Sequence, residues 1–140
     1  MYRSTRQSVM KYKYFYTDYA TNKEIPGEAP KVADRSRVMR SMKRVLQRPD
    51  NFLGILNDRN QCLQFMVNAD RSVLIDIPII GDGAFCGSKS KMATLSKCLA
   101  LVESLNGDED FQDLLPDEAF IAEAAVQEGF KKPWWKFWGK

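Results

Sequence analysis

The sequence predicts an α+β domain in which an antiparallel sheet of about four strands has two main helices packed on one face. Three short apolar stretches separated by polar turns are typical of neighbouring antiparallel strands. Two further stretches repeat apolar residues at the helical period. A length of 140 residues suits one core, so we expect a single domain over residues 1–140, with residues 130–140 as a candidate flexible tail.

The three apolar stretches are residues 52–56, 62–67 and 73–80, and we expect them to form a meander of strands. The polar clusters between them, Asp-Arg-Asn and Asn-Ala-Asp-Arg, contain the residue types that favour tight turns. A slip of one residue between two strands would turn every side chain to the other face. The apolar pattern therefore selects one register.

The selected register pairs Phe65 with Ile75 on one side and with Leu53 on the other, which gathers large apolar side chains on one face. The reverse face carries Gln64 opposite Asp76 and is mixed in polarity. We therefore expect the first face to lie against the core and the second to be partly covered.

A fourth strand is predicted over residues 9–17, where three tyrosines alternate with Lys11, Lys13 and Phe15. The two lysines suggest an edge strand, because exposed charges on an edge discourage pairing with other chains. A loop is expected to follow, over residues 19–30.

Helical periodicity predicts a first helix over residues 32–48 and a second over residues 91–105, the latter with Ser90 as its N-cap. A short third helix is expected over residues 117–127, and a strand over residues 120–126 is the alternative.

The glycine-bearing stretch over residues 81–92 is expected to be a loop that joins a strand to the second helix. It invites comparison with a phosphate-binding loop, whose glycine must directly precede the lysine. Here Ser88 separates Gly87 from Lys89, so we do not predict a nucleotide site.

The chain contains no histidine, which removes the commonest general base and metal ligand. Its three cysteines form no Cys-x-x-Cys pair, so we expect reduced thiols and no zinc site. No apolar run is long enough to span a bilayer and no secretory signal is evident, so we expect a soluble, cytoplasmic protein. We predict a non-enzymatic protein without a cofactor or metal.

Charge is distributed unevenly along the chain. Residues 1–50 contain twelve Lys/Arg against five Asp/Glu, whereas residues 103–128 contain nine acidic residues and no basic one. Such an acidic block either keeps the surface soluble or binds a basic partner. We predict that the acidic segment, residues 108–118, meets a protein partner. The predicted partner-binding residues are Asp108, Glu109, Asp110, Asp113, Asp117 and Glu118.

Two other features suggest partners. The helix over residues 35–48 carries Arg37, Arg40, Arg44 and Arg48 on the side opposite its apolar stripe, which is typical either of a solvated face or of contact with nucleic-acid phosphates. The end of the chain, KKPWWKFWGK, gathers all three tryptophans. We expect this tail to cover apolar surface or to meet a partner protein, and not to enter a membrane.

A strand CLQF, a turn, a strand VLIDIPII, a glycine-bearing loop and an amphipathic helix follow one another over residues 52–105. In this pattern the chain resembles the small immunity proteins encoded beside bacterial polymorphic or contact-delivered toxins. The resemblance implies a cytoplasmic protein that neutralises one cognate toxin by direct contact, and it carries over no toxin-binding residue. The alternative is a small nucleic-acid-associated protein that uses the arginine-striped helix.

Overall fold

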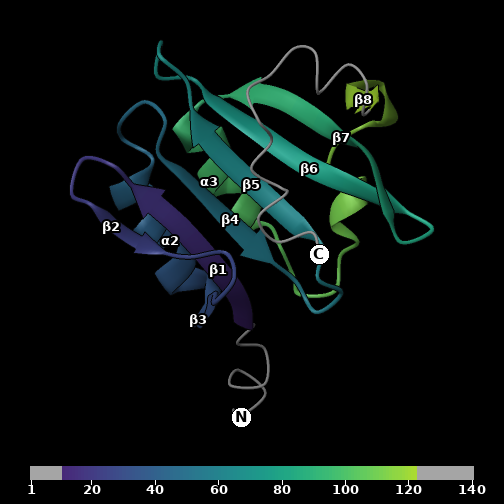
Figure 1. Ribbon diagram of the computed structural model, residues 1–140, viewed down its shortest axis with the longest axis horizontal. Coiled ribbons are helices and arrows are strands. Elements are labelled where there is room, and N and C mark those ends of the chain that lie inside the picture. The colour runs from purple at the N-terminus through teal and green to yellow at the C-terminus, as the bar shows by residue number, and fades with distance from the viewer. Residues whose placement is uncertain (1–10, 123–140) are drawn as a thin grey trace.

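A long antiparallel sheet with two helices on one face forms the framework of the protein, seen in a computed structural model that describes residues 11–122 (Figure 1). The strands are β1 Lys11–Asp18, β2 Lys23–Ile25, β3 Lys31–Asp34, β4 Phe52–Leu56, β5 Cys62–Val67, β6 Val73–Gly81, β7 Ala84–Ala93 and β8 Phe120–Ala122. The helices are α2 Arg35–Val45 and α3 Leu95–Glu103, and two 3₁₀ turns, η1 Phe111–Asp113 and η2 Asp117–Ala119, precede β8.

The eight strands follow the order β2-β1-β4-β5-β6-β7-β8, with β3 also paired to β1. Both helices lie behind the sheet in Figure 1, so one face is covered by helices and the other is helix-free. The predicted α+β class with an antiparallel sheet is confirmed. The expected size of about four strands is wrong, because three of the eight strands are only three or four residues long and β7 was expected to be a loop.

The register of the meander is confirmed at each pair that defines it. Phe65 pairs with Ile75 and with Leu53, and Gln64 pairs with Asp76. Both connecting turns place five residues between the last paired positions of the two strands. Each turn is closed by a backbone hydrogen bond, from the Asn57 amide to the Gln61 carbonyl oxygen in the first and from the Asn68 amide to the Ser72 carbonyl oxygen in the second. The turns thus set the register that the apolar pattern requires.

Strand β7 replaces the expected loop and the start of the expected second helix. Asp82 and Gly83 both have positive φ angles, 52° and 78°, as a two-residue type I′ hairpin turn requires. Because this turn matches the twist of the strands, it returns the chain along β6 for ten residues. Helix α3 begins only after Thr94, whose hydroxyl accepts from the Lys97 amide at 3.1 Å, so the expected Ser90 cap is wrong.

Strand β1 is an interior strand and not the expected edge. It pairs with β4 on one side and with β2 and β3 on the other. Lys11 and Lys13 are exposed, but they stand on the face of the sheet and do not guard an edge. The expected loop over residues 19–30 contains β2, and β3 follows it directly.

The two helices are shorter than expected at both ends, since 32–48 and 91–105 were predicted. Helix α2 begins after Asp34, whose carboxylate accepts from the Arg37 amide at 2.9 Å and so caps the first turn. In place of the expected third helix the chain forms one 3₁₀ turn, η2, followed by the strand β8. This favours the alternative prediction of a strand. The rest of both predictions, beyond Ala122, lies outside the described residues. The candidate tail over residues 130–140 also lies outside them. Phe120, at 42% exposure, is not a core residue.

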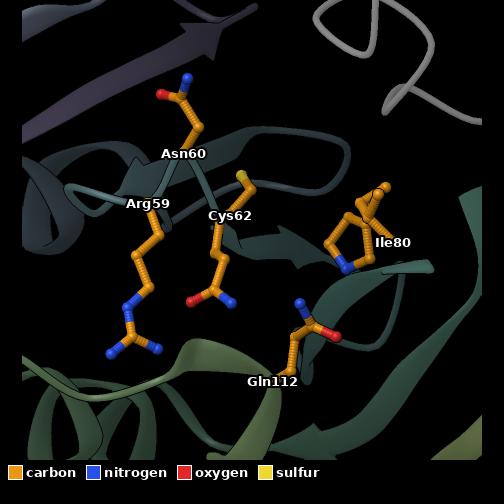
Figure 2. A pocket seen from close by; sticks show the side chains of 7 residues that line it. Arg59, Asn60, Cys62, Ile80 and Gln112 are labelled. Carbon is orange, nitrogen blue, oxygen red and sulfur yellow. The ribbon is translucent and has the colours of Figure 1, made fainter. Parts of the chain in front are cut away.

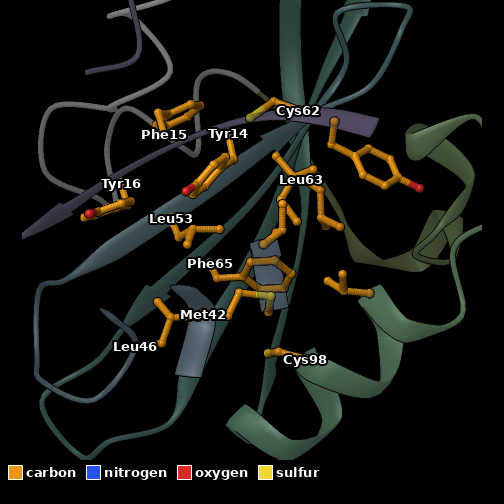
Figure 3. Close-up of a cluster of buried hydrophobic side chains, with 14 of the residues drawn as sticks. Tyr14, Phe15, Tyr16, Met42, Leu46, Leu53, Cys62, Leu63, Phe65 and Cys98 are labelled. Atoms are coloured by element: carbon orange, nitrogen blue, oxygen red, sulfur yellow. The ribbon is translucent and has the colours of Figure 1, made fainter. Parts of the chain in front are cut away.

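The main core lies between the helices and the sheet (Figure 3). The central members are fully buried and come from both layers: Phe65 and Leu53 from the sheet, Met42 from α2 and Cys98 from α3. The tyrosines of β1 add their rings on the same side. The side of the strand that carries the alternating tyrosines therefore faces the core.

The helix-free face is also largely buried. The Phe15 ring lies over Gly54, where a Cβ atom would come within 2.2 Å of the ring. Gln64 is 0% exposed and Asp76 is 7% exposed on this face. The prediction that the mixed face is partly covered is therefore confirmed. At Gln64 and Asp76 the burial is more complete than expected.

Candidate functional site

The acidic segment leaves the end of α3 and runs back to β8 through the two 3₁₀ turns. Phe111 and Leu115 are buried and tie the segment to the core at two points. The acidic side chains lie around these apolar contacts, at positions that range from half-buried to exposed. The segment is thus a shaped surface and not an unstructured solubilising stretch.

The β4–β5 turn holds the start of the acidic segment. Gln61 uses both ends of its amide: Nε2 donates to Asp110 Oδ1 at 2.8 Å, and Oε1 accepts from the Phe111 amide at 2.9 Å. Asn57 Nδ2 also donates to Gln61 Oε1 at 2.9 Å, which orients the glutamine. Arg59 lies 3.4 Å from the Asp110 carboxylate, but this exposed ion pair adds little stability.

Lys89 holds the end of the acidic segment. It projects from β7 with its side chain 10% exposed. Its ammonium group donates to the carbonyl oxygens of Gln112 and Leu115 at 2.7 and 3.1 Å, and to Asp117 Oδ1 at 3.1 Å. Three donors meet three acceptors, as a buried ammonium requires. Lys89 therefore serves an internal contact and not a phosphate.

The six predicted partner-binding residues divide into two groups. Glu109 accepts from the amides of Asn106 and Gly107 at 2.6 and 3.2 Å and closes a local turn. Asp110 and Asp117 accept from Gln61 and Lys89 in the same way. These three residues form the first group, whose carboxylates hydrogen-bond within the protein.

The other three residues, Asp108, Asp113 and Glu118, have exposed side chains. Within residues 11–122 the only ion pairs are Arg59–Asp110 and Lys89–Asp117. We define the acidic face as these three exposed residues, whose carboxylates no cation of the described chain neutralises.

A small pocket of about 280 Å³ adjoins the acidic segment (Figure 2). It lies between the β4–β5 turn, β6 and Gln112, and the Arg59 side chain extends toward the segment that carries Gln112. Cys62 is its only thiol, and burial raises the pKa of that thiol, so it is a poor nucleophile. The pocket is large enough for one side chain of a partner and offers amide and guanidinium groups to it.

The arginine stripe on α2 is partly engaged with the protein itself. Arg44 stacks on the Tyr16 ring at 5.6 Å from the centroid and donates to its hydroxyl oxygen at 3.3 Å. Arg40 donates to Ser36 Oγ at 3.2 Å. Arg37 and Arg48 are exposed, although Arg48 lies beyond the end of the helix at Val45.

A buried carboxyl group lies on the helix-free face. Burial raises the pKa of Asp76, against the opposing effect of hydrogen bonds from Ser90, whose hydroxyl donates to Oδ1 at 2.6 Å, and from Ser88. A raised pKa means that the folded protein holds this proton more tightly than the unfolded chain. Stability from this group therefore falls as the pH rises from the usual carboxyl value of 3.8 through the raised pKa.

We expect Asp76→Asn to be more stable than the wild type at neutral pH, because the amide carries no charge to bury and keeps the oxygen that accepts from Ser90. Urea unfolding across a pH series measures the difference. The advantage of the variant should shrink as the pH falls toward 3.8. A difference that does not vary with pH would contradict a titrating Asp76.

Among residues 11–122, neither helix is long and apolar enough to cross a lipid bilayer. Comparison of the chain with protein-family models, with curated proteins and with solved structures finds no significant match. The geometry of the site is therefore the basis on which its function is argued.

Proposed function

We propose that the protein is a non-enzymatic binding protein whose acidic face docks on a basic surface of a protein partner. The observation that carries the proposal is the double anchoring of the acidic segment, by Gln61 at its start and Lys89 at its end. The backbone that carries the acidic face is thus held in position before the partner arrives.

Preorganisation lowers the entropic cost of binding, because the segment need not be ordered during association. Its uncompensated charge would also steer a basic partner toward it, which raises association rates from about 10⁵–10⁶ M⁻¹s⁻¹ to as much as about 10⁸–10⁹ M⁻¹s⁻¹ at low salt. The adjoining pocket offers a place for one protruding side chain of the partner.

The resemblance to immunity proteins suggests the class of partner, a cognate toxin that the protein neutralises by direct contact. A toxin that acts on nucleic acid would present the basic surface that the acidic face requires. The cytoplasm is the compartment proposed, and the three unpaired cysteines suit its reducing conditions.

The test changes only the acidic face, through the triple variant Asp108→Asn, Asp113→Asn and Glu118→Gln. With a partner captured from the native host, surface plasmon resonance across a salt series should show association about tenfold slower at low salt, with a weaker salt dependence. Thermal stability should be unchanged, since none of these side chains anchors the segment.

The matched control removes three charges of the opposite sign, with Arg37→Gln, Arg40→Gln and Arg48→Gln. It should leave the association rate at or above that of the wild type. If the acidic variant associates as fast as the wild type and protects cells equally well, the acidic face is a solvated surface only and the proposal fails.

A second candidate function is nucleic-acid binding through α2, where no acidic residue interrupts the exposed arginines. The engagement of Arg44 with Tyr16 weakens this alternative, because it occupies one member of the stripe. The alternative requires the wild type to bind generic duplex or single strands at physiological salt. Submicromolar binding that the arginine control abolishes would favour this function over the acidic face.

A further inference from the structure

One cationic side chain of the protein itself lies in the pocket beside the acidic segment. Arg59 is part of the pocket lining, and its side chain extends toward the segment that carries Gln112 (Figure 2). Its Nη1 atom lies 3.4 Å from Asp110 Oδ2, and the two side chains are 55% and 38% exposed. A strong charge-assisted hydrogen bond is shorter, at about 2.7–2.9 Å. The pair is therefore loose and open to exchange with another cation.

Asp110 uses one carboxylate oxygen within the protein and presents the other. Oδ1 accepts from Gln61 Nε2 at 2.8 Å and from the Gln112 amide at 2.9 Å, so the orientation of the carboxylate is fixed from two sides. Within residues 11–122, Arg59 is the only partner of Oδ2. The protein thus holds an acceptor oxygen in a fixed position beside the pocket.

The rest of the pocket lining suits a guanidinium group. Gln112 forms hydrogen bonds within residues 11–122 through its backbone only, so its side-chain oxygen is able to accept. Pro78 and Ile80 provide apolar surface, with Ile80 across the pocket from Arg59 (Figure 2). A guanidinium carries five donors in a planar fork, whereas an ammonium is a compact and strongly hydrated charge. Two acceptors beside apolar surface therefore favour arginine over lysine.

Charge around the pocket favours a cation over an anion. Among the residues that line the pocket and their neighbours along the chain, Arg59 is the only positive charge, against Asp58 and Asp113. Asp110 adds a third carboxylate, 3.4 Å from Arg59. These groups repel a carboxylate of a partner and attract a basic side chain.

We propose that an arginine side chain of the partner enters this pocket and replaces Arg59 at Asp110 Oδ2. The inference rests on the proposed function and names the group that the partner contributes to it. Arg59 turns to solvent as the incoming guanidinium takes its contact, so the carboxylate keeps a cationic partner and no unpaired charge is buried. Once the partner shields the new pair from water, the pair is stronger than the exposed one that it replaces.

A small probe tests the pocket without the partner. The full-length protein is titrated with N-acetylarginine methylamide, and NMR follows the side-chain amide signals of Gln61 and Gln112. We expect both signals to shift, with a dissociation constant in the millimolar range for so small a ligand. The corresponding lysine probe should bind several-fold more weakly. The side-chain amide of Asn51, buried at the opposite end of β4, is the internal control and should not shift.

Two variants separate the competing cation from the acceptor. Arg59→Met removes the competitor, so the arginine probe should bind about two- to fivefold more tightly. Asp110→Asn keeps Oδ1 but turns Oδ2 into a donor, so the probe should bind about tenfold more weakly or worse. Hydrogen exchange at the Asp113 amide, which donates to the Asp110 carbonyl oxygen, verifies that the segment stays closed in this variant.

The matched control is Arg71→Met. It removes the same charge from the exposed β5–β6 turn, at the far end of β5 from Arg59, and should bind the probe as the wild type does.

Four results would overturn the inference. Unshifted Gln61 and Gln112 signals would show that the pocket does not take arginine, and weaker binding in Arg59→Met would make Arg59 part of the binding site. Equal affinity for the arginine and lysine probes would reduce the effect to general charge attraction. Shifts caused by N-acetylglutamate methylamide instead would make the pocket a carboxylate site. The titration involves no partner, so its failure is distinct from failure of the salt-series experiment on the acidic face.

Discussion

Phe65→Ala is expected to lower the free energy of unfolding by about 3–5 kcal/mol, enough to unfold a domain of ordinary stability at physiological temperature. Phe65 is 0% exposed and stands between Leu53 and Ile75 in the centre of the sheet. Its ring lies beside Met42 of α2, so truncation opens a cavity where the two layers meet (Figure 3). Neither layer can close that cavity without shifting the other.

The measurement is urea or thermal unfolding followed by circular dichroism. Phe120→Ala is the matched control, because it makes the same substitution at an exposed phenylalanine and should cost only a fraction as much. Equal losses for the two variants would mean that Phe65 does not occupy the centre of the core.

Lys89→Met is expected to have the second largest effect. Methionine keeps much of the side-chain volume but removes the ammonium group, so the carbonyl oxygens of Gln112 and Leu115 lose their donor. Each buried acceptor left without a partner costs about 1–3 kcal/mol. The acidic segment should also open more often, since one of its two anchors is lost.

Urea unfolding reports the loss of stability, and hydrogen exchange at the amides of Asp113, Leu114 and Ala119 reports the local opening. The control is Asp117→Asn, which alters only the exposed acceptor of the three and should leave stability nearly unchanged. Lys89 would not be an anchor if Lys89→Met lost no more stability than Asp117→Asn does.

The meander could be predicted from sequence because its apolar residues alternate in a way that only one register satisfies. Phe65, Leu53 and Ile75 share a face for the same reason that Gln64 and Asp76 share the other: successive side chains of a strand point to opposite sides. The turn residues agreed with that register, so local and non-local preferences pointed the same way.

Strand β7 could not be predicted from its alternation, because Ser88, Lys89 and Ser90 are all polar. Pairing with β6 and burial of Lys89 under the acidic segment stabilise this strand, and both contacts come from elsewhere in the chain. One local signal was available. Asp82-Gly83 after an apolar strand favours a two-residue hairpin, which excludes a helix immediately afterwards.

The candidate site was predicted in part. Charge density along the chain pointed to the acidic residues, but nothing in the sequence distinguished Asp110 and Asp117, which bond to Gln61 and Lys89, from the exposed Asp108 and Asp113. Gln61, an anchor of the segment, was missed, because its contacts join residues about fifty positions apart and have no local signature.

The strand order has a consequence for how the chain folds as it is made. From β4 to β7 each strand pairs with its neighbour in sequence across a connection of two to five residues, so this hairpin series closes at little entropic cost. Strand β1 leaves the ribosome well before β4, the partner with which Phe15 pairs at Gly54. Strand β1 thus waits for its central neighbour, and its tyrosines are apolar surface that a chaperone would meet on the nascent chain.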